Sequence, residues 1–530
     1  MKNQYPLVQM PFFSIEPKSV HFVGVLGIGV SSLARWFIAQ KWAVSGSDAA
    51  LNPIYQELKK DGLKANIGHK KANIPAKCGL VMYSQAIKRD NPELREARRR
   101  NIPILSYPQA IGELTKFYKT ICVSGMHGKS TTTALVGLML MKAGLDPTII
   151  IGTKLKKLSG KNFRAGKNEY LVLEADEYKD AFLNYSPFLT ITTNLDREHL
   201  DYFKNAEKIK KSFLEFFCRT RNGGTLILNR DNEMLRSLNR KIDKISKSNG
   251  LKVGWYSLRD KESAEIKKHI KLPGQHNISN ALAVFCLSKF LGISEKVFIS
   301  TISEYCGSWR RMEYRGELQI ANSKERMAKS HKPLAMCHVP VYDDYAHHPT
   351  EIKATLQAFR EKFPERRIIC VFQPHQAERM KLLFKEFKNA FGTADTVVIM
   401  PIYKVAGREP ACAGRSSAGS KYDSEFLVKS MQKSEPGRPI FYLKEPKNIK
   451  NALNVLLSAR SFPCPLLART NADDTQNNAE NFPRKSALSQ RNSAGYIVAK
   501  HKSAVIVMMG AGNIVNYTDT LLKVRKVESS

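Results

Sequence analysis

Thr120-Ile-Cys-Val-Ser-Gly-Met-His-Gly-Lys-Ser-Thr-Thr-Thr133 decides how the middle of this chain folds. Its apolar start predicts a strand, its two glycines predict a turn, and its hydroxyl-rich end predicts a helix that begins at Thr131 to Thr133. Such a turn directs backbone N–H groups at an anion, while a lysine adds a point charge and a serine offers a hydroxyl to Mg²⁺. Because Val123 stands where the general pattern has glycine, the match is to Gly-x-x-Gly-Lys-Ser. We call residues 125–130 the phosphate loop, and the nucleotide contacts predicted around it are Gly125, His127, Gly128, Lys129, Ser130 and Thr131.

Length and composition limit the class of protein. The 530 residues suffice for two to four domains, and 43% hydrophobic against 25% charged residues is typical of a soluble globular protein. No apolar run approaches the roughly 18 residues of a membrane helix, and the first residues do not resemble a secretion signal. We therefore expect a cytoplasmic protein with no membrane partner. The nine cysteines lack Cys-x-x-Cys spacing, which predicts neither disulfides nor a zinc site.

The formal net charge of +36 suits a polyanionic partner. Lysine and arginine are nevertheless spread along the chain, in short clusters such as residues 95–100 and 267–271, and no basic-aromatic platform accompanies them. We expect no nucleic-acid partner. The charge reflects either small polyanionic substrates or the general composition of the surface.

Strands alternate with helical segments along the chain, which predicts α/β domains with parallel sheets. The first strand runs from Val20 into Gly24, Gly27 and Gly29, and the second ends at Asp48. This is the order of a Rossmann-type βαβ unit. Because the spacing is Gly-x-x-Gly-x-Gly, a redox dinucleotide is not the first choice of ligand.

Carboxylates follow two strands beyond the phosphate loop. Tyr170 to Glu177 predicts a strand that ends in three carboxylates, and Phe188 to Asn194 predicts another that leads into an acidic turn. Ligands gather at the carboxyl ends of strands in such sheets, and hydroxyl and carboxylate oxygens suit Mg²⁺. For the third carboxylate, Glu177, a helix N-terminal charge is a sufficient interpretation. The candidate metal ligands are Ser130, Glu174 and His199, with a structural role as the alternative for the histidine.

Two further segments carry polar groups for a nucleotide. A turn at Pro273 leads into a helix with Asn277 and Asn280 near its start, where the amides either cap the helix or face a base. Arg310 and Arg311 stand next to an expected domain boundary. Arg311 either reaches a γ-phosphate or is a surface arginine.

Taken together, these motifs resemble the Mur ligase family of ATP-dependent, peptide-bond-forming enzymes of peptidoglycan synthesis. Three later segments, Val341 to Glu351, Val371 to Gln376 and Val507 to Ile514, are similar to the members that add L-alanine. The resemblance covers about residues 18–410 and the last strand. It implies an α/β protein of three domains: a Rossmann-like UDP-sugar-binding domain at 1–114, a central P-loop-type ATPase domain with a mostly parallel sheet at 115–315, and a Rossmann-like ligase domain at 316–530 with insertions near 321–340 and 461–500.

The same resemblance implies an activity. The family members that add alanine join L-alanine to the lactyl carboxylate of UDP-N-acetylmuramate, through an acyl phosphate formed from ATP with Mg²⁺. Because two anions must meet, the reaction needs positioning and charge neutralisation more than covalent catalysis. Lys129, Arg311 and Mg²⁺ would supply that neutralisation. The expected partners are these small molecules, and the expected state is a monomer or a weak homodimer.

The resemblance also assigns residues to the ends of the substrates. Asn277, Asn280 and Asp344 become nucleotide contacts. Either His347 or His348 removes a proton from the incoming amine, or both only orient substrate. The UDP end is lined by Gly24, Gly27, Gly29, Ser47, Asp48 and Ser84, and the amino-acid and lactyl end by His347, His348 and Arg379.

Some positions depart from the family, and two alternative functions stay open. Leu26 and Ser32 stand where the family usually has glycine, and Ala377 and Glu378 replace its aromatic and hydroxyl residues. One alternative is a ligase that attaches recycled murein tripeptide, which the segment Glu174 to Tyr178 suits. The other is a non-catalytic UDP-sugar- or nucleotide-binding protein, against which the intact set of nucleotide and metal candidates argues.

Overall fold

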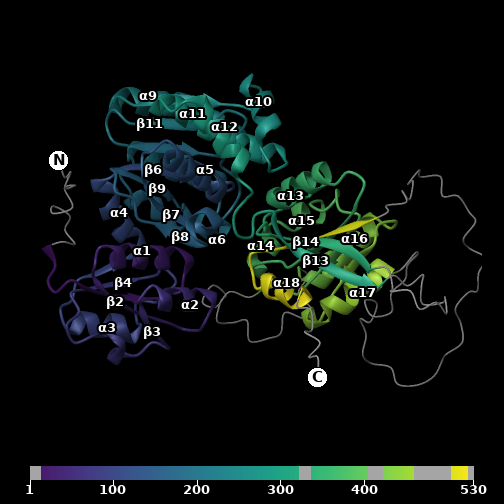
Figure 1. The fold of residues 1–530 in the computed structure, drawn as a ribbon, viewed down its shortest axis with the longest axis horizontal. Helices are drawn as coiled ribbons and strands as arrows, with labels where there is room; N and C mark the ends of the chain where they lie inside the picture. The colour runs from purple at the N-terminus through teal and green to yellow at the C-terminus, as the bar shows by residue number, and fades with distance from the viewer. Residues whose placement is uncertain (1–13, 322–335, 404–421, 459–502, 523–530) are drawn as a thin grey trace, which may run out of the picture. The chain divides into compact units, whose positions relative to one another are not determined.

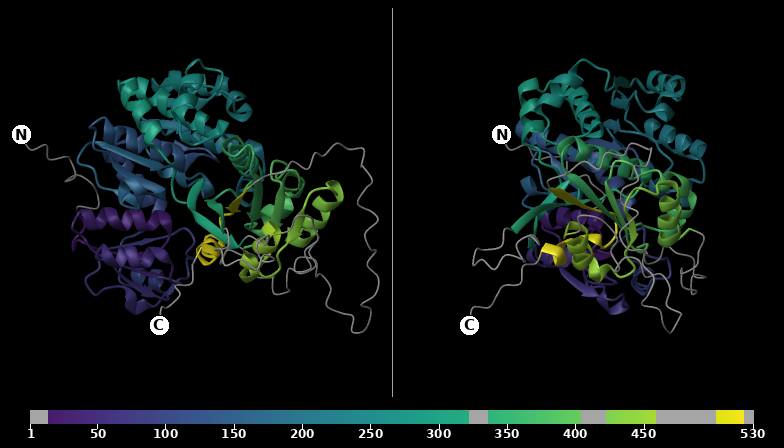
Figure 2. Two further views of the ribbon diagram at one scale, coloured as in Figure 1. Left: turned by 45° about the vertical axis from the view of Figure 1, so that its right-hand side comes forward. Right: turned by 90° about the vertical axis from the view of Figure 1, so that its right-hand side faces the viewer.

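The computed structural model describes residues 14–321, 336–403, 422–458 and 503–522 (Figure 1). The chain divides into two compact units, Met1–Glu313 and Tyr314–Ser530. The first unit holds a five-stranded and a seven-stranded sheet, and a six-stranded sheet belongs to the second. Helices pack around each sheet (Figure 2), which confirms the expected α/β class with mostly parallel sheets.

The N-terminal sheet has five parallel strands in the order β3-β2-β1-β4-β5. Its helices begin where local chemistry favours a start, since the side chains of Asn52 and Asn91 cap α2 and α3 and a proline follows each cap. The chain passes from β1 through α1 to β2, so the glycine turn lies at the carboxyl end of β1, as expected for a Rossmann-type unit. The elements are β1 Ser19–Val23, α1 Ile28–Ala39, β2 Ala43–Asp48, α2 Pro53–Lys60, β3 Lys64–Ile67, β4 Leu80–Tyr83, α3 Pro92–Arg99, β5 Ile104–Ser106 and α4 Tyr107–Phe117.

The central sheet has the order β12-β11-β10-β6-β9-β7-β8 and is parallel except for β8. β6 lies between β10 and β9, so the phosphate loop leaves the middle of the sheet. α5 begins at Lys129, earlier than predicted, because Gly128 with a φ of 85° already turns the chain at the N-cap. The elements are β6 Lys119–Ser124, α5 Lys129–Lys142, β7 Thr148–Leu155, β8 Lys161–Arg164, β9 Tyr170–Glu174, the 3₁₀ segment η5 Tyr178–Asn184, β10 Leu189–Thr192, α6 Leu200–Phe203, α7 Ala206–Cys218, β11 Thr225–Asn229, α8 Glu233–Arg236, α9 Asn239–Asn249, β12 Lys252–Tyr256, α10 Glu262–His269, α11 Gln275–Leu291 and α12 Glu295–Glu304.

One hydrophobic core joins the two sheets of the first unit. Phe22 and Trp36 from the N-terminal part belong to the same buried cluster as Cys122 and Phe216 from the central part. Burial of this shared apolar surface stabilises both sheets as one unit. The sequence placed a domain boundary at residue 114, but α4 runs through that position to Phe117, so the connection there is a helix.

The sheet of the second unit has the order β13-β14-β18-β15-β16-β17. The insertion predicted near 321–340 is shorter than expected, because β13 extends to Ala321 and β14 begins at Met336, with Val339 buried in the sheet. Residues 322–335 and the insertion predicted at 461–500 lie outside the described residues. The elements are β13 Glu313–Ala321, β14 Met336–Asp344, α13 Pro349–Lys362, β15 Arg367–Phe372, α14 Ala377–Leu382, α15 Phe384–Lys388, β16 Thr396–Ile399, α16 Ser424–Ser434, β17 Ile440–Tyr442, α17 Ile449–Ser458, β18 Ala504–Met509 and α18 Ile514–Leu522.

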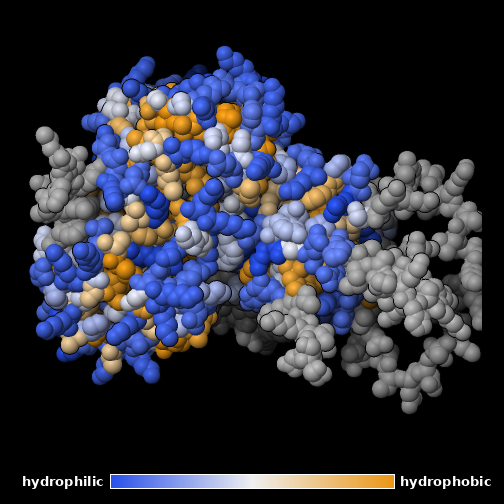
Figure 3. Space-filling model, viewed as in Figure 1, coloured by the Kyte–Doolittle hydropathy of each residue, from blue (hydrophilic) through white to orange (hydrophobic). Residues whose placement is uncertain are grey.

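Hydrophilic side chains cover most of the face drawn in Figure 3, and smaller hydrophobic areas lie between them. This agrees with a chain in which a quarter of the residues are charged. Among the residues that the structure describes, no helix combines the length and the apolarity that a membrane span requires.

Candidate active site

The phosphate loop connects β6 to α5 in the middle of the central sheet. Gly125 and Gly128 have φ angles of 119° and 85°, which residues with a Cβ rarely adopt. A Cβ on Gly128 would lie 2.5 Å from Oδ1 of Asn280, and one on Gly125 would lie 2.3 Å from Oγ1 of Thr193. Both glycines are therefore required by conformation and by space. Asn280, a predicted nucleotide contact, lies directly against the loop.

Lys129 is held by a buried carboxylate. Its Nζ donates to both carboxylate oxygens of Glu177, at 3.0 and 2.9 Å, and to the carbonyl oxygen of Gly125 at 2.6 Å. Burial disfavours the ionised form of Glu177, but Lys129 and His199 outweigh burial and lower the pKa of Glu177 to about 2. Burial likewise opposes the charge on Lys129, yet the neighbouring carboxylates, Glu177 first, raise the pKa of Lys129 above its ordinary value.

Ser130 and Glu174 lie next to each other on α5 and β9. Oγ of Ser130 donates to Oε2 of Glu174 at 3.1 Å, and the N–H of Gly152 donates to Oε1 at 2.7 Å. Burial raises the pKa of Glu174, although the Gly152 N–H and Lys129 both favour its charged form. Two of the three predicted metal ligands are thus in direct contact.

The third candidate ligand, His199, contacts a different carboxylate. Its Nε2 lies 3.3 Å from Oε1 of Glu177, and ligand atoms of Asp176, Glu177 and His199 lie within 4.8 Å of one another. Burial opposes protonation of His199, but Glu177 raises its pKa above the ordinary value. Glu177 precedes η5 and also joins His199 to Lys129, so a helix N-terminal charge is not its whole role. The sequence signal was a third carboxylate at a strand end, which does not reveal the direction of its side chain.

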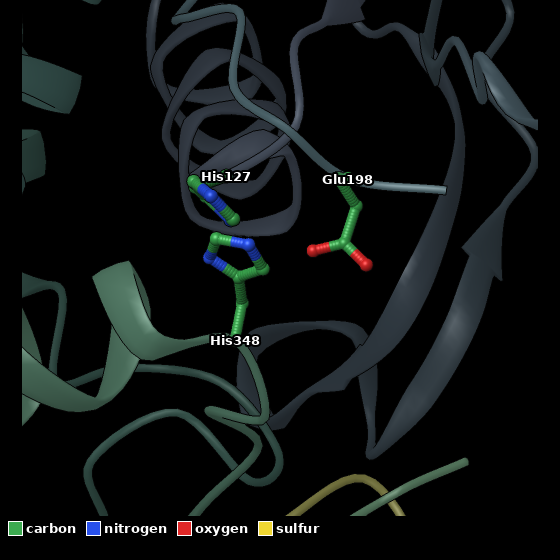
Figure 4. Close-up of side chains that lie close together, drawn as sticks. All are labelled: His127, Glu198 and His348. Carbon is green, nitrogen blue, oxygen red and sulfur yellow. The ribbon is translucent and has the colours of Figure 1, made fainter. Parts of the chain in front are cut away.

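The segment after β10 holds the phosphate loop in place. Oδ1 of Asn194 accepts the N–H of His127 at 2.9 Å, and Nδ2 of Asn194 donates to the carbonyl oxygen of His127 at 2.8 Å. Nε2 of His127 lies 2.9 Å from Oδ2 of Asp196. Figure 4 shows the His127 ring at the start of α5 and Glu198 on the segment that follows β10. Sequence reasoning assigned no role to Asn194 or Asp196, since a polar residue after a strand is too common to single out.

Local contacts fix the remaining residues of the first unit that were predicted to contact the nucleotide. Nδ2 of Asn277 donates to the carbonyl oxygen of Pro273 at 2.7 Å, so this amide stabilises the turn before α11. Thr131 is buried in the first turn of α5. Arg311 is partly buried, and its charge lies near enough to Glu174 to favour the ionised carboxylate. It is therefore more than an arginine on the open surface.

The glycine turn after β1 is closed by an aspartate. Oδ2 of Asp48 accepts the N–H of Leu26 at 2.8 Å, so the acidic residue at the end of β2 fixes the turn itself. Gly24 has a φ of 83°, and a Cβ there would lie 3.0 Å from Cβ of Ser84. A Cβ on Gly29 would lie 3.1 Å from the hydroxyl oxygen of Tyr107. These contacts bring the predicted UDP residues of β1, β2 and β4 to one edge of the sheet.

Ser47, a predicted UDP contact, has its side chain turned toward the interior. Its hydroxyl is buried and donates to Oε2 of Glu93 at 2.6 Å, and it lies 3.0 Å from Nδ1 of His69. Glu93 is fully buried and also contacts Nε2 of His21 at 3.0 Å and Nδ2 of Asn73 at 2.8 Å. A buried carboxylate needs several donors, which turns the Ser47 hydroxyl toward the interior.

We expect Glu93→Gln to weaken the fold at neutral pH. Burial opposes the charge of Glu93, but His21, Ser47 and Asn73 outweigh it and lower its pKa below the usual 4.5. A carboxylate with a lowered pKa contributes stability above the unfolded pKa, and that contribution is lost as pH falls through the folded pKa. The free energy of unfolding, measured in urea, is therefore expected to drop by about 2 kcal/mol at pH 7, with a smaller difference from the parent protein at pH 3.5.

Glu96→Gln on the same helix serves as the control, because Glu96 pairs with Arg99 near the surface. Its stability is expected to match the parent protein at both pH values. If Glu93→Gln lowered the free energy of unfolding by the same amount at pH 7 and at pH 3.5, the charge of Glu93 would not be the source of the stability.

The predicted residues of the second unit gather after β14. Asp344 is buried, and its Oδ1 accepts the N–H of Ala346 at 2.9 Å and the hydroxyl of Thr355 at 3.3 Å. Its carboxylate therefore shapes the turn into α13 within this unit. Nη1 of Arg379 lies 3.2 Å from Nδ1 of His375, and the His375 ring stacks on Tyr403 with centroids 5.8 Å apart. Sequence reasoning gave His375 no role of its own.

Comparison with known domains matches most of the described chain to one family. The family profile described as "Mur ligase family, catalytic domain" matches residues 19–119. The profile of the Mur ligase middle domain matches residues 123–288, and that of the Mur ligase glutamate ligase domain matches residues 326–460. The three matches occur in the order in which the sheets follow one another along the chain.

Curated relatives and solved structures agree with these matches. The chain is 37% identical over 403 residues to UDP-N-acetylmuramate–L-alanine ligase of Aquifex aeolicus, which covers 73% of this chain and 84% of the relative. It is 33% identical over 453 residues to the ligase of the same name from a Sulfurihydrogenibium species, covering 83% and 92%. The crystal structure of UDP-N-acetylmuramate-alanine ligase from Thermotoga maritima aligns with a TM-score of 0.66 at 21% identity, covering 95% of this chain and 98% of that one. A murein peptide ligase from Psychrobacter arcticus aligns with a TM-score of 0.59 at 20% identity, with the same coverage. At such identity the two structures show the fold alone.

Proposed function

This chain belongs to the Mur ligase family, and we propose that it is an ATP-dependent ligase that joins L-alanine to the lactyl carboxylate of UDP-N-acetylmuramate. The observation that carries the proposal is the 37% identity to a UDP-N-acetylmuramate–L-alanine ligase over 84% of that relative's length. The geometry supports it, because a glycine loop with a buried lysine at a sheet centre suits a triphosphate. The bond formed would be an early amide of a peptidoglycan precursor.

The residues around the phosphate loop suit the transfer of a phosphoryl group between two anions. Lys129 and Arg311 carry fixed positive charge on this side of the site, where it would offset the charge of ATP and of the attacking carboxylate. Lys129 is already ordered by Glu177, with Nζ held at 2.9 and 3.0 Å from its oxygens. A charge that is positioned in advance costs no reorganisation during the reaction.

We infer that Ser130 and Glu174 hold Mg²⁺. Their fit rests on donor chemistry, since a hydroxyl and a carboxylate oxygen lie 3.1 Å apart beside the loop and both are hard oxygen ligands. When bound, Mg²⁺ would neutralise charge on the phosphates. The role of His199 as a further ligand stays a prediction, because its ring faces Glu177.

The contacts of the two histidines in the second unit support different roles for them. Nδ1 of His347 lies 3.0 Å from the carbonyl oxygen of Tyr345 and 3.2 Å from Oε2 of Glu351. Both neighbours accept hydrogen bonds, so Nδ1 carries the proton and Nε2 of the neutral ring carries the lone pair. His348 has the opposite arrangement, because its Nδ1 accepts the N–H of Thr350 at 3.3 Å. We therefore assign proton removal from the amine to His347 and substrate orientation to His348.

The two roles predict different pH profiles. His347→Gln is expected to lower kcat about 100-fold and to remove the decline of kcat on the acid side, because a base that is protonated below its pKa is no longer present. His348→Gln is expected to keep the shape of the profile, since it removes only an orienting group. Both profiles come from phosphate release at saturating substrate. A profile altered by His348→Gln and unaltered by His347→Gln would reverse the assignment.

Phosphate release from ATP tests the function directly. With UDP-N-acetylmuramate present, we expect release with L-alanine and little with other amino acids or with murein tripeptide. Release with tripeptide and none with alanine would favour the recycling ligase, whose fold the Psychrobacter arcticus structure shares. No release with any acceptor would favour a binding protein. The cytoplasmic location and the monomeric or weakly dimeric state stay predictions.

A further inference from the structure

A polar cluster joins the two sheets inside the first unit, beside the apolar core. Asn162 on β8 of the central sheet is fully buried at this junction. Its neighbours come from α1, the helix that begins directly after the glycine turn. A buried amide requires partners for all of its polar atoms, so its contacts define one orientation.

The Asn162 amide donates to the first turn of α1. Nδ2 donates to the carbonyl oxygen of Ile28 at 2.5 Å and to Oγ of Ser31 at 3.0 Å. Ile28 stands between Gly27 and Gly29, two of the residues expected to approach the UDP pyrophosphate. The N–H groups of a first helical turn have no partner within the helix and form an anion site. A contact that fixes this turn therefore fixes the direction of its N–H groups.

The other side of the amide is held by a buried arginine. Oδ1 of Asn162 accepts from Nη1 of Arg35. Nε of Arg35 donates to Oδ2 of Asp61 at 2.7 Å, and Nη2 donates to Oε2 of Glu57 at 3.1 Å, while only 4% of the arginine side chain is exposed. Lys161, next to Asn162 on β8, donates to Oδ1 of Asp61 at 2.6 Å. Asn162 and Lys161 of the central sheet thus hold α1 and the end of α2, through their contacts with Arg35 and Asp61.

We propose that Asn162 is a positioning residue for the UDP-sugar. Although it lies in the ATP-binding part of the chain, its amide orients the glycine turn and the start of α1 in the UDP-binding part. The proposal rests on the proposed function and names a determinant of UDP-sugar affinity that lies outside the N-terminal sheet. It also explains a buried asparagine with three polar partners at a junction that apolar packing alone would hold together.

The Asn162→Asp variant tests whether the amide positions the UDP-sugar site or only anchors α1 to β8. The aspartate keeps the shape of the side chain and an acceptor for Arg35, but it loses both hydrogens donated to Ile28 and Ser31. We expect the Kd for UDP-N-acetylmuramate, measured by calorimetry without ATP, to rise at least about fivefold, with the KM for ATP changed less than about twofold. Asn168→Asp, the same substitution on the connection that follows β8, is the matched control and is expected to leave both values unchanged.

Thermal unfolding of each variant shows whether it is folded. If Asn162→Asp does not fold, Ser31→Ala removes one of the two acceptors on α1 and is expected to raise the same Kd by a smaller factor. An unchanged Kd in folded Asn162→Asp, or in Ser31→Ala when only that variant folds, would overturn the proposal. If the parent protein itself does not bind UDP-N-acetylmuramate, the proposed function fails instead.

Discussion

Lys129→Ala is expected to reduce turnover by at least about 1,000-fold, which corresponds to about 4 kcal/mol of transition-state stabilisation. In the described part of the first unit, Nζ of Lys129 is the amine that lies inside the phosphate loop, 2.6 Å from the carbonyl oxygen of Gly125. Removing it leaves the triphosphate without that charge and leaves Glu177 buried with less compensation. Phosphate release with UDP-N-acetylmuramate, L-alanine and ATP measures the loss.

Lys142→Ala provides a matched control for the loss of a lysine from α5. Lys142 lies at the last position of the same helix and pairs with Glu304 near the surface. We expect its turnover to stay within about twofold of the parent protein, because surface pairs of this kind contribute little. Near-normal turnover in folded Lys129→Ala would contradict the assignment of the phosphate loop.

Glu177→Gln is expected to lower the free energy of unfolding by about 3 kcal/mol and to impair turnover strongly. The substitution leaves Lys129 and His199 buried beside a neutral amide, and breaking a buried ion pair by removing one partner is costly. Lys129 would also lose the partner that orders its Nζ beside the loop. Urea unfolding measures the first effect, and phosphate release at saturating ATP measures the second.

The pH dependence of this variant follows from the pKa of Glu177. That pKa is about 2 in the folded protein against the usual 4.5, so the carboxylate contributes its stability above about pH 4.5 and loses it as pH falls toward 2. The difference in stability between Glu177→Gln and the parent should therefore shrink in acid. Glu207→Gln, at an exposed residue on α7 that pairs with Lys210, should match the parent throughout. If Glu177→Gln and the parent were equally stable at pH 7, the contacts of Glu177 with Lys129 and His199 would not stabilise the fold.

Local signals in the sequence were strong enough for the main elements of the site. Gly125 and Gly128 were predictable because the conformation they adopt is open to almost no other residue. Glu174 was predictable because it ends an apolar strand in the same α/β segment as the phosphate loop, and parallel strands present their carboxyl ends at one edge. The ends of helices and strands were harder to predict, since α4 continues past residue 114 and β14 begins at Met336.

Side-chain direction was not predictable in the same way. Ser47 lies near the carboxyl end of β2, but its hydroxyl turns inward because a carboxylate 46 residues later is buried beneath it. Glu177 looked like a helix N-terminal charge until its two cationic partners were seen on other elements. Sequence cannot distinguish the neighbouring rings of His347 and His348, because their tautomers depend on which backbone and carboxylate atoms face each nitrogen.

By itself, the sequence determined the order of strands and helices, the phosphate loop, the candidate ligands at strand ends and the family. Each of these depends on residues that are near one another along the chain, where local conformation and periodicity operate. Only the tertiary structure decided which charges share a buried environment and which way each polar group faces. Glu177 between Lys129 and His199, and Asn162 against α1, are contacts across 22 to 134 residues of chain. Such contacts form only when elements far apart in the sequence pack together, because burial makes every unpaired polar group costly and so selects its partners.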